Sequence, residues 1–103
     1  AAQAKMEELG LIAPIVGHVG DGNFHTSLLV MKDDPDEMAR GREYISWLNE
    51  TAIGMEGTCT GEHGIGQGKR QYLEAELGEA TDVMRAIKVA IDPDNIMNPG
   101  KIF

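Results

Sequence analysis

The stretch GHVGDGNFH at residues 17–25 constrains the fold more than any other, because it predicts a tight β-hairpin. Its centre, Asp21-Gly22, favours a type I′ turn, in which both central residues need a positive φ. Segments rich in β-branched and apolar residues flank this centre, PIVGHVG at 14–20 and FHTSLLVM at 24–31. We therefore predict two antiparallel strands joined by a two-residue turn.

A turn centred on Asp21-Gly22 also sets the pairing of the two strands. Counting outwards makes His18 and His25 directly opposed partners, and opposed partners share one face of a sheet. The other face is expected to be the core face, with the apolar side chains Ile15, Val19, Phe24, Leu28 and Val30. A slip of one residue would send these apolar side chains to the polar face.

A second glycine-rich stretch, GEHGIGQGKR at residues 61–70, offers a further ligand for a metal ion. Two imidazoles side by side can bind one metal, and Glu62 would complete a set that suits zinc, manganese or iron. In an extended segment His63 points the other way from Glu62, which leaves it available as a general base. Two alternatives stay open: a half-buried, hydrogen-bonded histidine pair, and a flexible glycine loop that caps a helix.

Residues Asp34-Pro35-Asp36-Glu37 predict the start of a long helix, with Asp as N-cap, Pro at the first position and Glu completing a capping box. This helix is expected to run to about Ile53 and to stop at Gly54. Its apolar residues recur at helical spacing on one stripe: Met38, Ile45, Leu48, Ala52 and Met55.

The other expected elements are an opening helix closed by Gly10, a short strand GTCT at 57–60, a helix at about 69–77 that ends at Gly78, and a last helix that stops at Asp92-Pro93. The order of strands and helices indicates an α+β domain with an antiparallel hairpin.

Composition excludes several classes of protein. A net charge of −8 argues against binding to nucleic acid or to anionic membrane surfaces, both of which favour basic patches. No apolar run reaches the roughly 18 residues of a membrane span. The single Cys59 cannot form an internal disulfide and suits a buried apolar position, so we expect a reducing compartment, the cytoplasm. The opening residues read as the end of a helix without an initiator Met, so we expect part of a longer protein.

Two nucleotide-binding motifs are also excluded. A Walker A loop needs Ser or Thr after its Gly-Lys, whereas Gly68-Lys69 is followed by Arg70. The dinucleotide fingerprint needs glycines spaced G-x-G-x-x-G after a strand, and GIGQG does not have that spacing.

Three motifs in order, GHVGDGNFH, GTCTGEHGIGQGKRQYL and IDPDNIMNPGKIF, resemble the C-terminal end of the flavin-dependent D-2-hydroxyacid dehydrogenases. This family contains D-lactate dehydrogenase (cytochrome), the glycolate oxidase D subunit and D-2-hydroxyglutarate dehydrogenase. The similarity runs from about residue 12 to the end, and GTCTGEHGIG is most similar to the D-lactate branch. The resemblance implies that residues 1–103 are the C-terminal portion of a cap domain with a partial ferredoxin-like α+β fold, C-terminal helices included. It also implies that the N-terminal FAD-binding domain of the family is absent from this chain.

The resemblance also implies roles for individual residues: His18, His25 and Glu62 as ligands of a divalent metal (zinc or manganese), His63 as catalytic base, Asn23 near the substrate, and Asn98 near FAD. Ser27 stands where the D-2-hydroxyglutarate branch has asparagine, which argues against a dicarboxylate substrate. The implied reaction is oxidation of a small D-2-hydroxy acid, such as D-lactate or glycolate, to the 2-oxo acid. The implied partners are this substrate and an FAD-binding domain, while the electron acceptor stays open.

Under this interpretation the chain is inactive by itself. A second hypothesis is a stand-alone metal-dependent hydrolase, in which the same two histidines and Glu62 activate a water molecule. A third is a non-catalytic, oligomerising domain, in which a homodimer covers exposed apolar surface.

Overall fold

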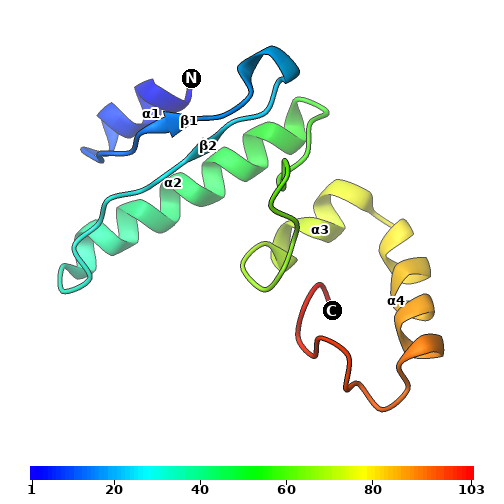
Figure 1. Cartoon of the computed structure of the whole chain (residues 1–103). Coiled ribbons are helices and arrows are strands. Elements are labelled where there is room, and N and C mark those ends of the chain that lie inside the picture. Colours follow the sequence, from blue (N-terminus) through cyan, green and yellow to red (C-terminus); the bar gives the residue numbers. More distant parts are fainter. The chain divides into compact units, whose positions relative to one another are not determined.

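The computed structural model describes residues 1–103, and the chain forms two compact units, residues 1–51 and residues 52–103. Figure 1 shows the elements in chain order: α1 (Ala2–Glu8), β1 (Ile15–Val16), the 3₁₀ helix η1 (Val19–Asp21), β2 (His25–Thr26), α2 (Pro35–Gly54), α3 (Arg70–Leu77) and α4 (Ala80–Ile91). β1 and β2 pair in antiparallel fashion, and no other strand joins them. Helices together with an antiparallel hairpin confirm the predicted α+β class.

The core of the first unit forms where α1 and α2 pack on the hairpin segments. Its buried residues are Met6, Leu11 and the completely buried Tyr44, and Leu9, Ala13, Leu28, Val30, Trp47 and Leu48 pack against them. The predicted stripe on the long helix is correct at Leu48 and wrong at Ile45 and Met55, whose exposed fractions are 43% and 76%.

The buried face of α2 contains Gly41 and Tyr44 instead of Ile45. Gly41 is buried because a neighbouring segment lies directly on it: a Cβ atom there would lie 3.3 Å from Cγ1 of Val30. A small residue therefore sets which face of the helix meets the core, and the apolar spacing alone did not reveal it.

The predicted register of the hairpin is wrong. Val16 pairs with His25 and Ile15 with Thr26, so His18 and His25 are not directly opposed. The reason lies in the loop, because the carbonyl of His18 accepts hydrogen bonds from the backbone N–H groups of Asp21 (2.8 Å) and Asn23 (3.2 Å). The Asp21 bond and the bond from the N–H of Gly22 to the carbonyl of Val19 (3.1 Å) form the 3₁₀ turn η1. The Asn23 bond closes a connection that is longer than two residues.

Gly22 has a positive φ of 70° but Asp21 does not, whereas a type I′ turn needs a positive φ at both. A non-glycine residue pays a steric cost in that left-handed region, which the 3₁₀ turn avoids at Asp21. The predicted core face is only partly correct. Leu28 and Val30 pack on the core, but Ile15, Val19 and Phe24 are exposed by 43%, 78% and 43%.

Two predicted helix ends are confirmed by their hydrogen bonds. Gly10 follows α1 and has a φ of 63°. The N–H of Gly10 donates to the carbonyl of Glu7, and the N–H of Leu11 donates to the carbonyl of Met6. This is the pattern of a Schellman motif. At the start of α2, Oδ1 of Asp34 accepts the N–H groups of Asp36 and Glu37, each at 3.0 Å.

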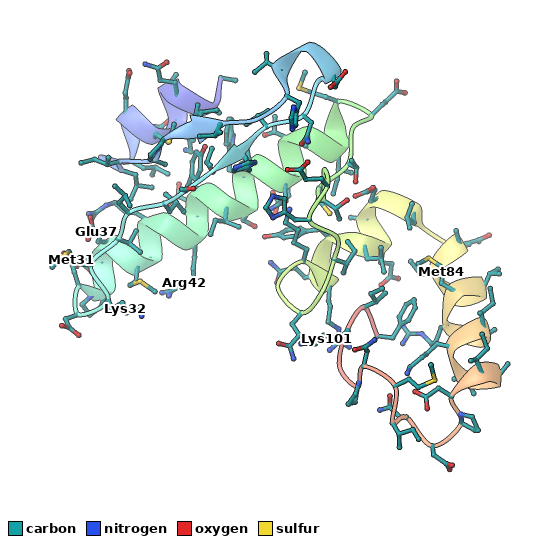
Figure 2. All side chains as sticks on the ribbon, viewed as in Figure 1. Met31, Lys32, Glu37, Arg42, Met84 and Lys101 are labelled. Carbon is teal, nitrogen blue, oxygen red and sulfur yellow. The ribbon has the colours of Figure 1, made fainter.

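The capping box predicted at this helix start forms only in part, because Glu37 does not bond back to Asp34. The carboxylate of Glu37 accepts the backbone N–H of Met31 at 2.7 Å, and Figure 2 shows these two residues side by side. Glu37 thus joins the first turn of α2 to the segment that precedes its N-cap, rather than closing a box on Asp34.

Helix α2 runs one residue beyond its predicted end. Gly54 is its last residue, and Glu56 follows with φ 61°, the left-handed position of the helix end. The predicted strand at 57–60 is absent, because Cys59 directs its backbone hydrogen bonds to side chains of the next helix.

The remaining helices end where the sequence predicts. α3 spans Arg70–Leu77 with Gly78 at its C-cap, and α4 stops at Ile91 before Asp92-Pro93. The buried apolar side chains of this unit are Cys59, Tyr72 and Leu73. None of the helices is both long enough and apolar enough to cross a bilayer.

Candidate functional site

The candidate residues are divided between the two units. His18, Asn23 and His25 belong to residues 1–51, and Glu62, His63 and Asn98 belong to residues 52–103. A common metal site formed by His18, His25 and Glu62 therefore stays a prediction.

The first glycine-rich motif places its histidines in different surroundings. His18 is exposed and precedes η1, whereas His25 is half-buried within β2. Gly17 lies between β1 and His18, and it is required by close approach, because a Cβ atom there would lie 2.5 Å from the carbonyl oxygen of Asn23. Asn23 is half-buried, and its backbone N–H bonds to the carbonyl of His18.

The second motif brings a carboxylate and an imidazole together. Nε2 of His63 lies 3.7 Å from Oε1 of Glu62, and the two side chains are exposed by 59% and 51%. The prediction that they point in opposite directions is wrong, because the segment turns instead of extending. The N–H of His63 bonds to the carbonyl of Thr60 at 3.0 Å, and Gly61 adopts φ 51° within that turn.

The base of this loop is held by charged side chains. Oε2 of Glu76 accepts the N–H of Cys59 at 2.9 Å, and the ammonium group of Lys69 donates to the carbonyl of the same Cys59. Burial raises the pKa of the Cys59 thiol to about 11, with a further contribution from Glu76. Burial also acts to raise the pKa of Glu76, but hydrogen bonds from Cys59 and Thr58 outweigh it, so that pKa lies below its usual value.

The C-terminal tail forms a second candidate feature with α4. An apolar groove of about 440 Å³ is lined by Met84, Ile87, Lys88, Ile91, Asp92, Met97, Asn98, Lys101, Ile102 and Phe103. Figure 2 marks Met84 on the helix side and Lys101 on the tail side of this unit. Asn98, the residue predicted to contact FAD, lines this groove and adopts a positive φ of 46°.

The turn that leads into this tail is organised by one buried carboxylate. Asp92 accepts the N–H groups of Ile96 (2.9 Å) and Met97 (3.0 Å) and is paired with Lys88. The ammonium group of Lys88 also donates to the carbonyl of Met97 at 2.6 Å. The Lys88 bond and the two backbone bonds hold the pKa of Asp92 below its usual value despite burial.

Lys69, Glu76 and Asp92 were not predicted from the sequence as structural parts of these loops. One signal was present: Lys69 stands at the N-cap of α3, where Ser, Thr, Asp or Asn is favoured. The side chain of Lys69 does not cap the helix and instead donates to the carbonyl of Cys59. No comparable signal marks Glu76, whose role depends on the path of a segment 17 residues away.

Comparison with known proteins identifies the class. The family profile "FAD linked oxidases, C-terminal domain" matches residues 1–102. D-lactate dehydrogenase [cytochrome] 1, mitochondrial, from Saccharomyces cerevisiae is 52% identical over 99 residues, which are 95% of this chain and 16% of that protein. D-lactate dehydrogenase [cytochrome], mitochondrial, from Arabidopsis thaliana is 40% identical over 103 residues, 99% of this chain and 18% of that protein. Glycolate oxidase subunit GlcD from Bacillus subtilis is 48% identical over 88 residues, 84% of this chain and 19% of that protein.

The chain therefore belongs to the FAD-linked oxidase family, as a C-terminal domain of that family. This confirms the resemblance drawn from the three sequence motifs. The chain spans less than a fifth of the length of these relatives.

Proposed function

We propose that this chain is the C-terminal part of an FAD-dependent dehydrogenase that oxidises a small D-2-hydroxy acid, of the D-lactate or glycolate type, to the 2-oxo acid. In this proposal the chain supplies a divalent-metal site and a catalytic base. The single observation that carries the proposal is the match of one oxidoreductase family across both glycine-rich motifs and the tail. The names of the yeast and Bacillus relatives support the substrate class.

The residues present suit a divalent metal. Two imidazoles from His18 and His25 and one carboxylate from Glu62 form a donor set typical of zinc or manganese sites that keep positions open for a substrate. When bound, the metal would act as a Lewis acid that lowers the pKa of the substrate hydroxyl. Glu62 and His63 are both half-exposed, which allows a small anion to approach them.

The chain also offers a surface that suits the ring system of FAD rather than its phosphates. The groove between α4 and the tail is mostly apolar and carries a few polar groups, among them Asn98, as is usual for cofactor rings. When bound, FAD supplies the acceptor for a hydride. The phosphates would be bound by the FAD-binding domain, which is the partner that this proposal requires.

The proton transfer is assigned to His63. Oxidation of a 2-hydroxy acid removes a proton from the hydroxyl oxygen and a hydride from Cα, so a base must lie within hydrogen-bond reach of that oxygen. Nε2 of His63 lies 3.7 Å from Oε1 of Glu62, so this imidazole lies beside the carboxylate that would hold the metal. Asn23, on the hairpin loop, is proposed as a further substrate contact.

Metal binding is tested first, by titration of the metal-free protein with Mn²⁺ and Zn²⁺. We expect metal binding to weaken about 10-fold to 100-fold or more in each of the variants His18→Ala, His25→Ala and Glu62→Gln. Loss of a residue that hydrogen-bonds to a metal ligand already has an effect of this size, and loss of the ligand itself costs at least as much. Glu56→Gln is the matched control for the acidic ligand, since Glu56 is an exposed carboxylate shortly before the same loop. Equal affinity in Glu62→Gln and Glu56→Gln would contradict the metal assignment, and a protein that binds no metal at all would favour the non-catalytic alternative.

Catalysis is tested in the full-length protein that contains the chain. D-lactate or glycolate is expected to bleach the flavin, and His63→Gln is expected to slow that reduction about 100-fold or more while FAD remains bound. A colourless protein that hydrolyses esters only with zinc or manganese would contradict the proposal and favour the metal-dependent hydrolase.

The predicted cytoplasmic location has one alternative, which is the mitochondrial location in the names of the yeast and Arabidopsis relatives.

A further inference from the structure

A single peptide segment at the base of the Glu62–His63 loop is bound from both sides by charged side chains of α3. The N–H of Cys59 donates to the carboxylate of Glu76, and its carbonyl accepts from the ammonium group of Lys69. Lys69 is the N-cap residue of α3, and Glu76 lies in the last turn of the same helix. Helix α3 and its N-cap residue therefore hold both backbone polar groups of Cys59.

The segment between these anchor points has little structure of its own. It contains Gly61, Gly64, Gly66 and Gly68, of which the first three adopt positive φ values of 51°, 76° and 52°. Glycine has the largest conformational freedom to lose, so a loop of this composition samples many conformations unless its ends are fixed. The Lys69 bond ties Cys59 to the residue at the other end of the loop and closes the loop at its base.

Burial strengthens the hydrogen bonds that close this loop. Cys59 is only 5% exposed, and the side chains of Lys69 and Glu76 are themselves half-buried, so water competes weakly for these bonds. Hydrogen bonds with a charged partner are roughly twice as strong as neutral ones. The lowered pKa of Glu76 is consistent with a carboxylate that stays ionised while it accepts them.

The far side of the loop has a second tie, which comes from the C-terminal tail. The N–H of Ile102 donates to the carbonyl of Gly66 at 2.8 Å, and the guanidinium of Arg70 donates to the carbonyl of Gly100 at 3.5 Å. Figure 1 shows the tail returning to the loop that leads into α3. Ile102 adopts φ 68°, which is unfavourable for a β-branched residue and indicates that its surroundings impose it.

We propose that Lys69 and Glu76 are positioning residues, which clamp the Cys59 peptide and so hold the loop that presents Glu62 and His63. The catalytic consequence rests on the proposed function of that loop, whereas the clamp itself does not. Neither side chain needs to touch the substrate, because both act through the backbone of Cys59.

The clamp is tested by Lys69→Met and Glu76→Gln, which remove a charge at nearly constant size. The matched controls are Lys32→Met, an exposed lysine outside this unit, and Glu74→Gln, an exposed glutamate on the same helix. Two readouts are independent of catalysis: amide hydrogen exchange at residues 59–64, and the rate at which iodoacetamide alkylates the Cys59 thiolate. The second rate is corrected for the thiol pKa measured in each variant, because Glu76 itself raises that pKa. Both rates are expected to rise about tenfold or more in the clamp variants, from the loss of a hydrogen bond to a charged group, and to stay unchanged in the controls.

Catalysis provides the third readout, in the full-length protein that contains the chain. The clamp variants are expected to lower kcat about tenfold with KM little changed, and Lys69→Arg, which keeps the charge, is expected to restore most of kcat. Exchange and alkylation rates equal to those of the controls would overturn the clamp. Faster exchange with an unchanged kcat would overturn its positioning role. Faster exchange in a protein that oxidises no 2-hydroxy acid would support the clamp and contradict the proposed function.

Discussion

Gly17 approaches Phe24 so closely that no side chain fits between them: a Cβ atom on Gly17 would lie 2.4 Å from Cα of Phe24. Rotamer changes cannot relieve a contact with backbone, so we expect Gly17→Ala to destabilise the protein by about 3 kcal/mol. It is also expected to weaken Mn²⁺ binding, because the hairpin that carries His18 and His25 must open.

Gly20→Ala is the control for this prediction. Gly20 lies in the same loop, has an ordinary φ and would meet no atom within 4 Å, so its replacement should leave stability within about 0.5 kcal/mol. Urea unfolding of both variants measures the difference. Equal midpoints would show that the hairpin does not require the close approach at Gly17.

Tyr44 is the most deeply buried side chain of the first unit, and its hydroxyl has no hydrogen-bond partner. An unpaired buried hydroxyl carries a desolvation cost of about 1–3 kcal/mol. Tyr44→Phe removes this group and keeps the ring, whose centroid lies 6.3 Å from that of Trp47. We therefore expect the free energy of unfolding to stay constant or to rise by about 1 kcal/mol.

The contrasting variant at this position is Tyr44→Ala, which also removes the ring. It is expected to cost about 3–5 kcal/mol, as for other large-to-small changes of aromatic residues in cores. Guanidinium unfolding followed by Trp47 fluorescence measures both variants. A marked loss of stability in Tyr44→Phe would mean that the hydroxyl is bound in solution.

Glu56 occupies the left-handed position at the end of α2, with φ 61°. The neighbouring hydrogen bonds, from Glu56 to Ile53 and from Gly57 to Ala52, form a Schellman motif, where glycine is the usual residue. We expect Glu56→Gly to raise the free energy of unfolding by about 1 kcal/mol, because it relieves the steric cost of that conformation.

The control for this effect is a glycine placed inside the helix. Glu50→Gly, on the exposed surface of α2, is expected to destabilise by roughly 0.5–1 kcal/mol. Thermal unfolding distinguishes the two, with a higher Tm for Glu56→Gly and a lower one for Glu50→Gly. If Glu56→Gly also lowers Tm, the strain at this position is not significant.

Asp92 gives the protein a pH dependence of known sign. Its pKa in the folded protein lies below the ordinary value, first because of Lys88 and then because of the Ile96 and Met97 N–H groups. A depressed pKa means that this carboxylate stabilises the fold above about pH 4, its unfolded value. The contribution is lost as the pH falls through the folded pKa.

The expected result is that Asp92→Asn destabilises at neutral pH, and that its difference from the wild type shrinks towards zero in strong acid. Asp94→Asn, an exposed carboxylate two residues further on, should show no such difference at either pH. Urea unfolding at a series of pH values measures both variants. A difference from the wild type that does not depend on pH would contradict the assigned role of the charge.

The helix boundaries were largely predictable, because they depend on bonds between residues that are neighbours in the chain. Gly10 and Gly78 follow helices as expected, Asp34 caps α2, and Asp92-Pro93 ends α4. Each of these signals acts through one or two local hydrogen bonds or through a restricted φ, so the residue type alone indicates the outcome.

The register of the hairpin was not predictable in the same way. Asp21-Gly22 is compatible with a two-residue turn, yet the bonds accepted by the carbonyl of His18 create a longer connection. The register also depends on how the adjoining segments pack, and that packing cannot be read from the two turn residues.

By itself, the sequence determined the class of the domain, its family, its helix ends and the chemical types of its candidate metal and catalytic residues. Tertiary structure alone decided that Val16 and not His18 faces His25, that Tyr44 occupies the core, and that Lys69 and Glu76 hold the peptide of Cys59. The physical reason is the separation along the chain of the residues that interact. Caps and turns are settled within a few residues, whereas pairing, burial and charged clamps depend on which distant segments the folded chain brings into contact.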